Sequence, residues 1–478
     1  MLLVLRLVRS GACLLAVLFL FSSVLWAQVE SVALPKNTEE AEKKTENHSL
    51  YITLEEAQKL ALEGNSTLRS QQLSLEASRR EAQSRWNSFL PGISLSGSLS
   101  NSHTIYAPKS SSLGGGGGAG GNSSGKSSGN SAWSWGASGG LNLSLTAGIP
   151  VQMKLASLRY ELAQINYESQ RQTILSSVAS SFYNLLTSTK NLTVLEDNVA
   201  LTRQQYQQAL QNYNRGLASE LDMLRAQYAA LSAEPQLDKA RSQYESDLAA
   251  FQLLIGSQEK YIPQGDFSLQ QLQLPEAQVL VDSYLEQRLD VIQKRQSVQE
   301  AELSKTAQML SAKAPSISLS ENIRLSPTGN SMSGTPSVSG SFSVGVSIPV
   351  DGYIPGSSKS LTVEKSKDSV ETARINLETT LAQARQDIIN KANNVKLLWH
   401  SVEVARLNET IAERSYQLSQ EGYRAGLVSQ TDMENSRQQM VSAQLSGSTS
   451  QSQYLVGVEQ LAIALGLQVQ EVYELFGI

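Results

Sequence analysis

The fold of this chain is decided by the stretch YNRGLASELDM at residues 213–223, because it recurs as YRAGLVSQTDM at residues 423–433. Each copy places a glycine, Gly216 or Gly426, between two segments of helical periodicity. Glycine at such a point permits the tight reversal that joins two antiparallel helices. The recurrence therefore predicts that the chain contains two copies of one helical unit.

Shorter matches extend the repeat and keep their order along the chain. They pair Glu76-Ala77 with Glu300-Ala301, Pro91 to Ser96 with Pro315 to Ser320, Leu143 to Leu145 with Val346 to Ile348, and Tyr244 and Gly256 with Tyr454 and Gly466. We therefore expect a first helix–strand–strand–helix repeat over 50–256 and a second over 276–466. An irregular linker at 257–275 joins them, and a C-terminal segment follows at 467–478.

Local chemistry predicts the elements of each repeat. Thr53 and Glu56 have the spacing of a capping box, so a helix starts at 54, breaks at Gly64-Asn65 and continues to 89. Apolar and small residues alternate over 93–106 and again at 141–145, which is the period of a strand. Further helices are expected at 152–214, 220–255, 277–313, 358–424 and 429–465, and further strands at 316–326 and 338–349.

One face of the helix at 152–214 carries apolar residues at alternating spacings of three and four. This period is typical of coiled-coil packing, because it keeps one seam against a partner helix. At 1.5 Å per residue, the helix would be roughly 95 Å long. The expected seam positions are 178, 182, 185, 189, 192, 196, 199, 203, 206, 210 and 213. Eight of these eleven positions are apolar, namely Val178, Phe182, Leu185, Leu192, Val199, Tyr206, Leu210 and Tyr213.

The strand segments are poor in charge, and neither 92–105 nor 337–350 contains Lys, Arg, Asp or Glu. An uncharged, half-apolar strand suits a wall between lipid and water. Open sheet edges are excluded from lipid, and four strands are too few to close a barrel, so strands of other copies are expected to join them. A small soluble sheet at one end of a helical bundle is the alternative. Trp133 and Trp135 suit either an interfacial aromatic belt or loop contacts.

Together, these residues resemble the TolC-type outer-membrane factors, which form the outer membrane efflux protein family. The resemblance covers roughly residues 50–470 and rests on short motifs in a fixed order. The motifs are Leu54 to Ala57 followed by Ala61-Leu62, Phe89-Leu90-Pro91, the Tyr-x-x-Gly turns at 213–216 and 423–426, and the closing segment from Leu461 to Gly466.

The resemblance implies a mainly α-helical protein with a small transmembrane β part, made of long coiled-coil helices and four β-strands per chain. A homotrimer would form a 12-stranded β-barrel in outer-membrane lipid and an α-helical tunnel in the periplasm. The trimer would be an efflux duct, not an enzyme. It would carry substrates from an inner-membrane pump of the RND or ABC type, through a periplasmic adaptor protein, to the cell exterior. The adaptor-contacting tip turns would include Gly216, Leu217, Gly426 and Leu427.

The resemblance also implies a periplasmic gate near these turns. Asp432 falls on a position where the family constricts the tunnel with a ring of aspartates, and Asn435 falls on the next ring position, which is neutral here. Such a ring attracts cations. The family's closing contact maps onto Tyr423 and Asp222, whereas Val428 replaces the basic residue of a second closing contact. An ordinary role at a helix start is the alternative for Asp432.

Residues 1–27 are expected to be a cleavable signal peptide, because two arginines precede an apolar run that ends at Trp26, and Ala27 suits the last position before cleavage. An uncleaved anchor is the alternative. Cys13 is the only cysteine and lies at the start of the run, so no lipid anchor is expected. Residues 28–49 are polar and are expected to be flexible.

Motifs of other functions lack the context that they need. The segment GGNSSGKS at 120–127 matches a phosphate-binding loop, but neither a strand nor a helix flanks it. His48, His103 and His400 lack the spacing of metal ligands. The net charge of −5 argues against a nucleic-acid partner. We therefore expect no metal, no cofactor and no catalytic site.

A periplasmic coiled-coil adaptor or scaffold protein without a channel is the competing hypothesis. An adaptor would carry a compact β-rich domain between its paired helices. Neither 85–155 nor 313–355 has such a pattern, so the sequence favours the duct.

Overall fold

The computed structural model of the protein describes residues 50–102, 132–327 and 335–477. These residues belong to one unit that begins at Leu50. The strand expected over 93–106 can therefore be followed only to Ser102. The other predictions that lie outside the described residues concern the signal peptide at 1–27, Cys13, the segment at 28–49, His48, His103 and the loop motif at 120–127.

After the short strand β1, which was not predicted, the first half of the described chain follows the predicted order of elements. Thr53 and Glu56 form the expected capping box: the Thr53 hydroxyl accepts the Glu56 N–H at 3.4 Å, and the Glu56 carboxylate accepts the Thr53 N–H at 3.0 Å. The elements are β1 (Leu50–Ile52), α2 (Leu54–Gly64), α3 (Ser66–Gln83), the 3₁₀ helix η2 (Ser84–Phe89), β2 (Gly92–Ser102), β3 (Ala132–Thr146), α4 (Ile149–Asn214) and α5 (Glu220–Ile255).

The second half repeats this order with three features that the sequence analysis missed. The helix expected at 277–313 is interrupted at 285–288, the linker contributes a strand that pairs in parallel with β1, and the C-terminal segment forms a helix. The elements are β4 (Tyr261–Pro263), α6 (Ala277–Tyr284), η3 (Leu285–Gln287), α7 (Leu289–Lys313), β5 (Ser316–Pro327), β6 (Pro336–Ser347), η4 (Val350–Tyr353), α8 (Ser358–Arg424), α9 (Gln430–Leu465) and α10 (Val469–Phe476).

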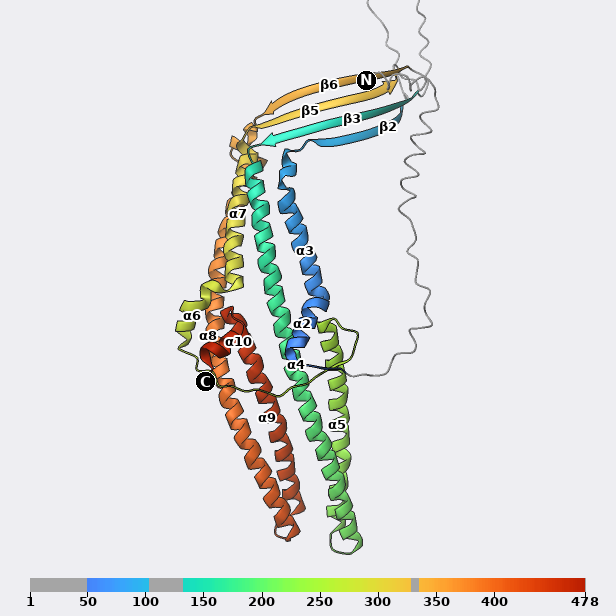
Figure 1. Ribbon diagram of the computed structural model, residues 1–478, viewed down its shortest axis with the longest axis vertical. Coiled ribbons are helices and arrows are strands. Elements are labelled where there is room, and N and C mark those ends of the chain that lie inside the picture. Colours follow the sequence, from blue (N-terminus) through green and yellow to red (C-terminus); the bar gives the residue numbers. More distant parts are fainter. Residues whose placement is uncertain (1–49, 103–131, 328–334, 478) are drawn as a thin grey trace, which may run out of the picture. The chain divides into compact units, whose positions relative to one another are not determined.

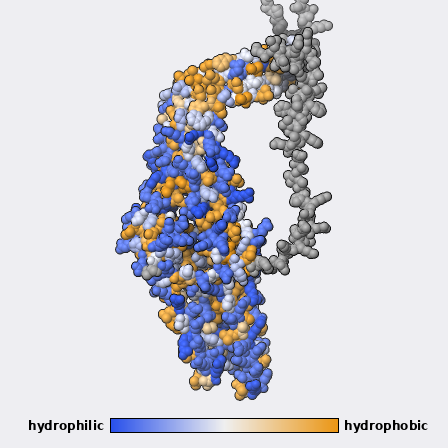
Figure 2. All heavy atoms as spheres, viewed as in Figure 1, coloured by the Kyte–Doolittle hydropathy of each residue, from blue (hydrophilic) through white to orange (hydrophobic). Residues whose placement is uncertain are grey.

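The four long strands form one antiparallel sheet in the order β2-β3-β5-β6. Its register sorts the side chains by chemistry, since Leu319 pairs with Leu143 and Val344, whereas Ser138 pairs with Ser96. The hydroxyl groups of Ser96 and Ser138 lie 2.7 Å apart and share a hydrogen bond. In Figure 2, apolar residues gather over the sheet, whereas hydrophilic residues dominate the helices. The sheet thus has an apolar face and a serine face.

Both faces follow from the two-residue period of a strand. The apolar face consists mainly of Ile93, Leu95, Leu99, Trp133, Trp135, Leu141, Leu143, Leu145, Ile317, Leu319, Ile323, Leu325, Val338, Phe342, Val344 and Val346. The serine face consists mainly of Ser94, Ser96, Ser98, Ser100, Ser134, Ser138, Ser144, Ser316, Ser318, Ser320, Ser326, Ser337, Ser339, Ser341, Ser343 and Ser347. Both tryptophans therefore belong to a strand and to the apolar face.

The helices pack side by side in two rows, an upper row nearer the sheet and a lower row nearer the turns (Figure 1). Helices α4 and α8 are long enough to belong to both rows. In the upper row, α3 contacts α4, α4 contacts α7, and α7 contacts α8. In the lower row, α5 contacts α4, α4 contacts α9, and α9 contacts α8. The upper row thus ends in α3 and α8, the lower row ends in α5 and α8, and the sheet ends in β2 and β6.

The seam predicted on α4 is correct in its first part and only partly correct in its second part. Val178, Phe182 and Leu185 are buried as expected. Farther along, the expected Val199 is also buried, but so are Leu195 and Thr202, which lie outside the predicted seam, and the expected Tyr213 is exposed. An α-helix has 3.6 residues per turn, so a strict 3.5-residue pattern drifts around a long straight helix. The buried side of α4 has moved by about one residue.

The ends of α9 and α10 lie in the largest apolar cluster, which also includes residues of α6, α7 and α8. Tyr454 is fully buried there, and its hydroxyl donates to the carbonyl of Gln270 at 2.6 Å. Among the described residues, no single helix is both long and apolar enough to cross a membrane. Only α9 and α10 taken together, with a 95° bend between them, reach the required length and composition.

The two halves make the same contact where a broken helix meets the end of a returning one. Asn65, between α2 and α3, donates to the carbonyl of Leu254 in the last turn of α5 at 2.7 Å. Arg288, between η3 and α7, donates to the carbonyl of Ala464 in the last turn of α9 at 3.1 Å. We call these contacts the first and second joints. Each joint gives a helix-terminal carbonyl the partner that it lacks within its own helix.

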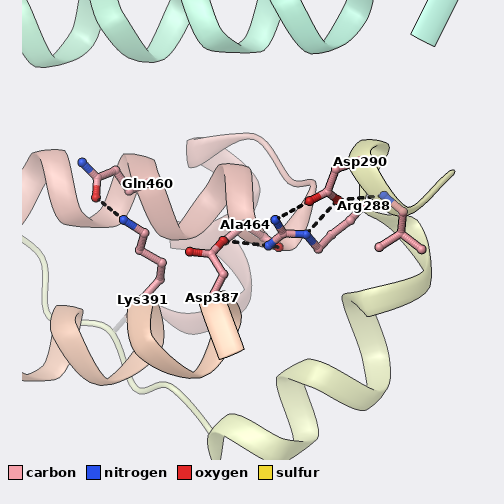
Figure 3. Close-up of polar contacts among 7 residues, drawn as sticks. Arg288, Asp290, Asp387, Lys391, Gln460 and Ala464 are labelled. Carbon is pink, nitrogen blue, oxygen red and sulfur yellow. Dashed lines mark hydrogen bonds and ion pairs between the residues drawn. The ribbon is translucent and has the colours of Figure 1, made fainter. Parts of the chain in front are cut away.

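Arg288 also holds two carboxylates at the second joint (Figure 3). Its guanidinium lies 2.8 Å from Asp290 of α7 and 2.9 Å from Asp387 of α8. Burial acts to raise the pKa of Asp290, but the hydrogen bonds and charge of Arg288 outweigh it and lower that pKa. Nearby, Lys391 of α8 donates to Gln460 of α9 at 2.7 Å. These bonds explain why the helix expected at 277–313 is interrupted before Leu289.

Candidate functional site

The turn between α4 and α5 and the turn between α8 and α9 have the same backbone geometry. Gly216 and Gly426 have φ angles of 73° and 74°, which favour glycine. The N–H groups of Leu217 and Leu427 donate to carbonyls of the preceding helix, each at 2.8 Å. This is a Schellman-type helix end. The leucine side chains are 74% and 85% exposed, so each turn presents an apolar residue to its surroundings.

Asp222 and Asp432 occupy equivalent positions in the first turns of α5 and α9. Ser429 caps α9: its hydroxyl accepts the N–H of Asp432 at 3.1 Å and donates to the carboxylate of Asp432 at 2.7 Å. Ser219 makes the same two bonds to Asp222 at the same distances. Asp432 therefore has the ordinary role at a helix start that was considered as the alternative to a gate. Its side chain is nevertheless exposed, and so is that of Asn435 one turn later.

Asp222 lies close enough to Tyr423 for its charge to affect the ionisation of the tyrosine. Burial, and then the negative charge of Asp222, raise the pKa of the Tyr423 hydroxyl. Val428 packs closely on Gly422 in the last turn of α8. A Cβ added to Gly422 would lie 2.6 Å from a Val428 methyl group. The structure thus brings Tyr423 and Asp222 near each other and leaves Val428 in an apolar contact.

Arg225 makes a contact between the two turns that was not predicted from the sequence. Its guanidinium donates to the hydroxyl of Thr431 at 3.0 Å, which links α5 to α9 directly. Arg225 follows Asp222 by three residues, so the two lie on one side of α5. This spacing is the signal that could have revealed it.

Arg437 is a second functional candidate that the sequence analysis missed. It lies on α9 and is only 4% exposed. Its guanidinium donates to the side-chain oxygen of Asn198 on α4 and to the carboxylate of Glu434 one turn earlier on α9. A buried guanidinium without partners costs several kcal/mol, so these bonds fix how α9 lies against α4. Arg437 follows the buried Met433 by four residues, which is the spacing of a core position.

A third link between the helix pairs lies on the same side of α4. The amide of Gln205 on α4 donates to the hydroxyl of Tyr416 on α8 at 3.0 Å. Tyr416 is itself buried. Arg225, Arg437 and Gln205 thus supply polar contacts between the first and second helix pairs near the turns. We call these three contacts the clasp.

Glu459, farther along α9, is a half-buried carboxylate. Burial raises its pKa to about 7. Burial, and then the charge of Glu459, raise the pKa of Tyr183 on α4, whereas burial is the main cause of the raised pKa of Tyr473 on α10. The pKa of Glu459 in the unfolded chain is near 4.5, so the folded protein binds a proton more tightly. The contribution of protonated Glu459 to the free energy of unfolding is therefore complete below about pH 4.5, and it is lost as the pH rises through about 7.

Glu459→Gln is expected to remove this pH dependence, because the amide mimics the protonated acid and carries no charge. The variant should gain about 1–3 kcal/mol over the parent at pH 8 and very little at pH 4.5. Thermal unfolding of both proteins in the same detergent across pH 4.5–8 measures the difference. Melting curves whose separation does not change with pH would contradict the assignment.

The described residues offer no group of three or more His, Cys, Asp or Glu side chains that could hold a metal ion. His400 lies on α8 with a 73% exposed side chain, and its ring is 3.7 Å from the Glu403 carboxylate. This is a surface pair on one helix face. The turns and the clasp are the functional candidates that the contacts of the described residues support.

The sequence profile of one protein family, described as outer membrane efflux protein, matches residues 58–257 and 280–467. Its two segments end one residue after Gly256 and one residue after Gly466. No curated protein matches the chain in sequence.

Solved structures share the fold at low sequence identity. The CmeC outer membrane channel of Campylobacter jejuni is 18% identical, with 86% of this chain and 85% of that chain covered and a TM-score of 0.67. The outer membrane protein VceC of Vibrio cholerae is 15% identical, with 87% and 96% covered and a TM-score of 0.64. The MtrE outer membrane channel of Neisseria gonorrhoeae, in its open state, is 17% identical, with 87% and 89% covered and a TM-score of 0.62.

Proposed function

The chain belongs to the outer membrane efflux protein family, and we propose that three copies of it form a duct from the periplasm through the outer membrane. An adaptor protein in the periplasm and a pump of the RND or ABC type in the inner membrane deliver its substrates. The observation that carries this proposal is a pair of exposed apolar seams on the two end helices of the lower row.

The first seam lies on α5 and consists of Leu221, Leu224, Tyr228 and Leu231, which we call the α5 seam. These residues are 49–75% exposed and alternate at spacings of three and four. Such a pattern is typical of a coiled-coil contact. The partner helix α4 does not use it, because α5 packs inward through Ala226, Ala230 and Ala233.

The second seam lies on α8 and consists of Leu397, Val404, Leu407, Ile411 and Leu418, which we call the α8 seam. These side chains are 43–62% exposed, and four of them recur every seven residues. Ile388, Val395, Val402 and Tyr416 are buried, and most of them precede a seam residue by two positions. Two residues correspond to about 200° around a helix. Helix α8 thus has apolar stripes on opposite sides, and only one of them is covered within the chain.

The positions of the two seams favour a ring of identical subunits. They lie on different helices at opposite ends of the lower row, as β2 and β6 lie at opposite ends of the sheet. An interface that joins two different surfaces of identical chains is heterologous, and it closes into a ring when the rotation per subunit fits. In a trimer, the α5 seam of one copy packs on the α8 seam of the next, and β2 pairs with β6 of the neighbour.

The sheet supplies the chemistry that such a barrel needs. Backbone groups at the outer edges of β2 and β6 have no strand partner among the described residues, and lipid would leave them unsatisfied. Pairing between copies removes both edges. The apolar face then lies against lipid, with Trp133 and Trp135 suited to the membrane interface, and the serine face lines the lumen.

The turns and the clasp suit the periplasmic end of the duct. Exposed Leu217 and Leu427, each beside a glycine turn, are the proposed contacts for the adaptor. Asp432 and Asn435 are proposed to face the axis, where the aspartates of three copies would attract cations. The pair of Tyr423 and Asp222 is proposed to close the gate together with the clasp.

Export, cellular location and the internal repeat are part of the same proposal. Residues 1–27 act as a cleavable signal peptide that directs export, and the helical tunnel lies in the periplasm. The two repeats at 50–256 and 276–466, with a linker between them, reflect a duplicated unit. The duct has no catalytic role and no nucleic-acid partner.

The native mass of the protein extracted from the outer-membrane fraction in mild detergent tests the proposal. We expect a trimer that forms conducting pores in a planar lipid bilayer. A monomer that is released without detergent and forms no pores would instead support the periplasmic scaffold.

Removal of the Arg437 side chain is expected to loosen the closed end of the duct. Arg437→Ala takes the partner from Asn198 and Glu434 and should weaken the packing of α9 on α4 by about 3 kcal/mol. The mean conductance of single channels should therefore rise several-fold above that of the parent. The exposed Arg385 of α8 is the control, since Arg385→Ala removes the same charge away from the clasp. Equal conductance in all three proteins would exclude Arg437 from the gate.

A further inference from the structure

The strands carry only two charged residues among the described positions, and both lie on β5. These are Glu321 and Arg324. The other strand positions are mainly Ser, Gly and apolar residues. Each of these charges therefore has no other charged side chain beside it on its own face of the described strands.

The register puts the two charges on opposite faces. Arg324 pairs with Ser138 of β3 and Ser339 of β6, so it belongs to the serine face. Glu321 pairs with Leu141 and Phe342, so it belongs to the apolar face. The two residues are an odd number of positions apart, and side chains along a strand alternate between faces. They therefore do not neutralise each other across the sheet.

Arg324 is exposed and has no ion pair or side-chain hydrogen bond among the described residues. Its cross-strand neighbours are serines, whose short side chains leave the longer guanidinium standing above the surface. It lies eight residues after the start of β5, or about 26 Å along the strand from the end that joins α7. An unpaired positive charge thus lies toward the strand end farther from the helices.

We propose that Arg324 is a specificity-determining residue of the duct, and that the three copies form a positively charged ring in the barrel lumen that favours anions. This inference rests on the proposed trimeric barrel. The ring is opposite in sign to Asp432 near the turns, so the two ends of the pathway select for opposite charges. Charged cargo and ions then meet a second electrostatic filter before they leave.

The size of the effect follows from the width of the barrel. Twelve strands at the usual spacing and tilt give a radius of about 12 Å, so an arginine side chain reaches well toward the axis. Three such charges in water at about 0.1 M salt change the ratio of anion to cation permeability by roughly three- to tenfold. A change of this size is readily measured as a reversal potential.

The experiment measures reversal potentials of purified parent and variant channels in a planar bilayer under a KCl gradient. Arg324→Gln should shift permeability toward K⁺, Arg324→Glu should shift it further, and Arg324→Lys should resemble the parent. Glu321→Gln is the matched control, since it changes a charge three residues away on the opposite face and should leave the reversal potential unchanged.

Thiol labelling tests the orientation independently of conductance. The only natural cysteine lies at position 13, so Arg324→Cys and Glu321→Cys each introduce one reporter into the strands. A water-soluble thiosulfonate should modify the first and spare the second in membranes. If the parent conducts but Arg324→Gln and Arg324→Glu keep its reversal potential, the charged ring is wrong and the duct stands. If the parent forms no pore, the duct itself fails.

Discussion

The proposed trimer is expected to dissociate when two charges are placed in the α8 seam. Leu397→Glu together with Ile411→Glu puts two carboxylates where the proposed interface excludes water. Burial of an unpaired charge costs several kcal/mol, so the two changes should weaken association by more than about a hundredfold. Neither side chain is buried within its own chain, so each monomer should still fold. Native mass in detergent and circular dichroism measure the two outcomes separately.

Two further variants make this experiment specific. Leu397→Met with Ile411→Leu keeps the seam apolar and should leave the trimer intact. Leu231 of the α5 seam and Ile411 of the α8 seam lie at similar heights, 11 residues after the start of α5 and 13 residues before the end of α8. Leu231→Lys should therefore restore association to a variant that carries Ile411→Glu alone, because opposite charges then meet across the interface. A double glutamate variant that stays trimeric would rule out the α8 seam. Failure of the lysine to rescue would rule out its pairing with α5.

Gly256→Ala is expected to cost far more stability than the equivalent Gly466→Ala. Both glycines end a helix, with φ angles of 70° and 72°. A Cβ on Gly256 would lie 2.1 Å from the carbonyl oxygen of Gly64, whereas a Cβ on Gly466 would lie 3.4 Å from that of Gln287. Gly466→Ala should therefore lower the free energy of unfolding only by the left-handed backbone strain of about 1–2 kcal/mol. Gly256→Ala adds a clash between two backbones and should lower it by about 3–5 kcal/mol.

Thermal unfolding of the two variants and the parent in one detergent measures this contrast. Gly466→Ala serves as the control for the strain that both variants share. Equal melting temperatures for the two variants would show that the first joint relaxes to make room for a methyl group. The close approach of Gly64 and Gly256 would then not be a constraint on the fold.

Short-range chemistry explains why much of the fold could be predicted from the sequence. The helices expected at 220–255 and 358–424 begin and end where the structure has them, because serine caps and glycine ends act within a few residues. The alternation over 93–99 likewise predicts a strand with one apolar face. Such signals need no knowledge of what lies across the fold.

The missed features depend on partners far away in the chain. Strand β1 has only three residues and pairs with β4, more than 200 positions later, so it shows no periodic pattern of its own. The break before α7 depends on Arg288, which binds Asp387 and Ala464. Arg437 finds Asn198 through the packing of α9 on α4. Charged residues of this kind look like ordinary surface residues until the tertiary contact is known.

Helix length has a mechanical consequence for the duct. Helices α4 and α8 run unbroken for 66 and 67 residues, roughly 100 Å each. Each begins near the sheet, α4 just after β3 and α8 just after η4, and each ends at a turn. Their lower-row partners α5 and α9 have 36 residues each and end at the joints. We therefore expect the long helices to act as stiff rods that transmit force from the turns toward the sheet. We expect the short helices to pivot at the joints, which would widen the proposed gate while every helix keeps its backbone hydrogen bonds.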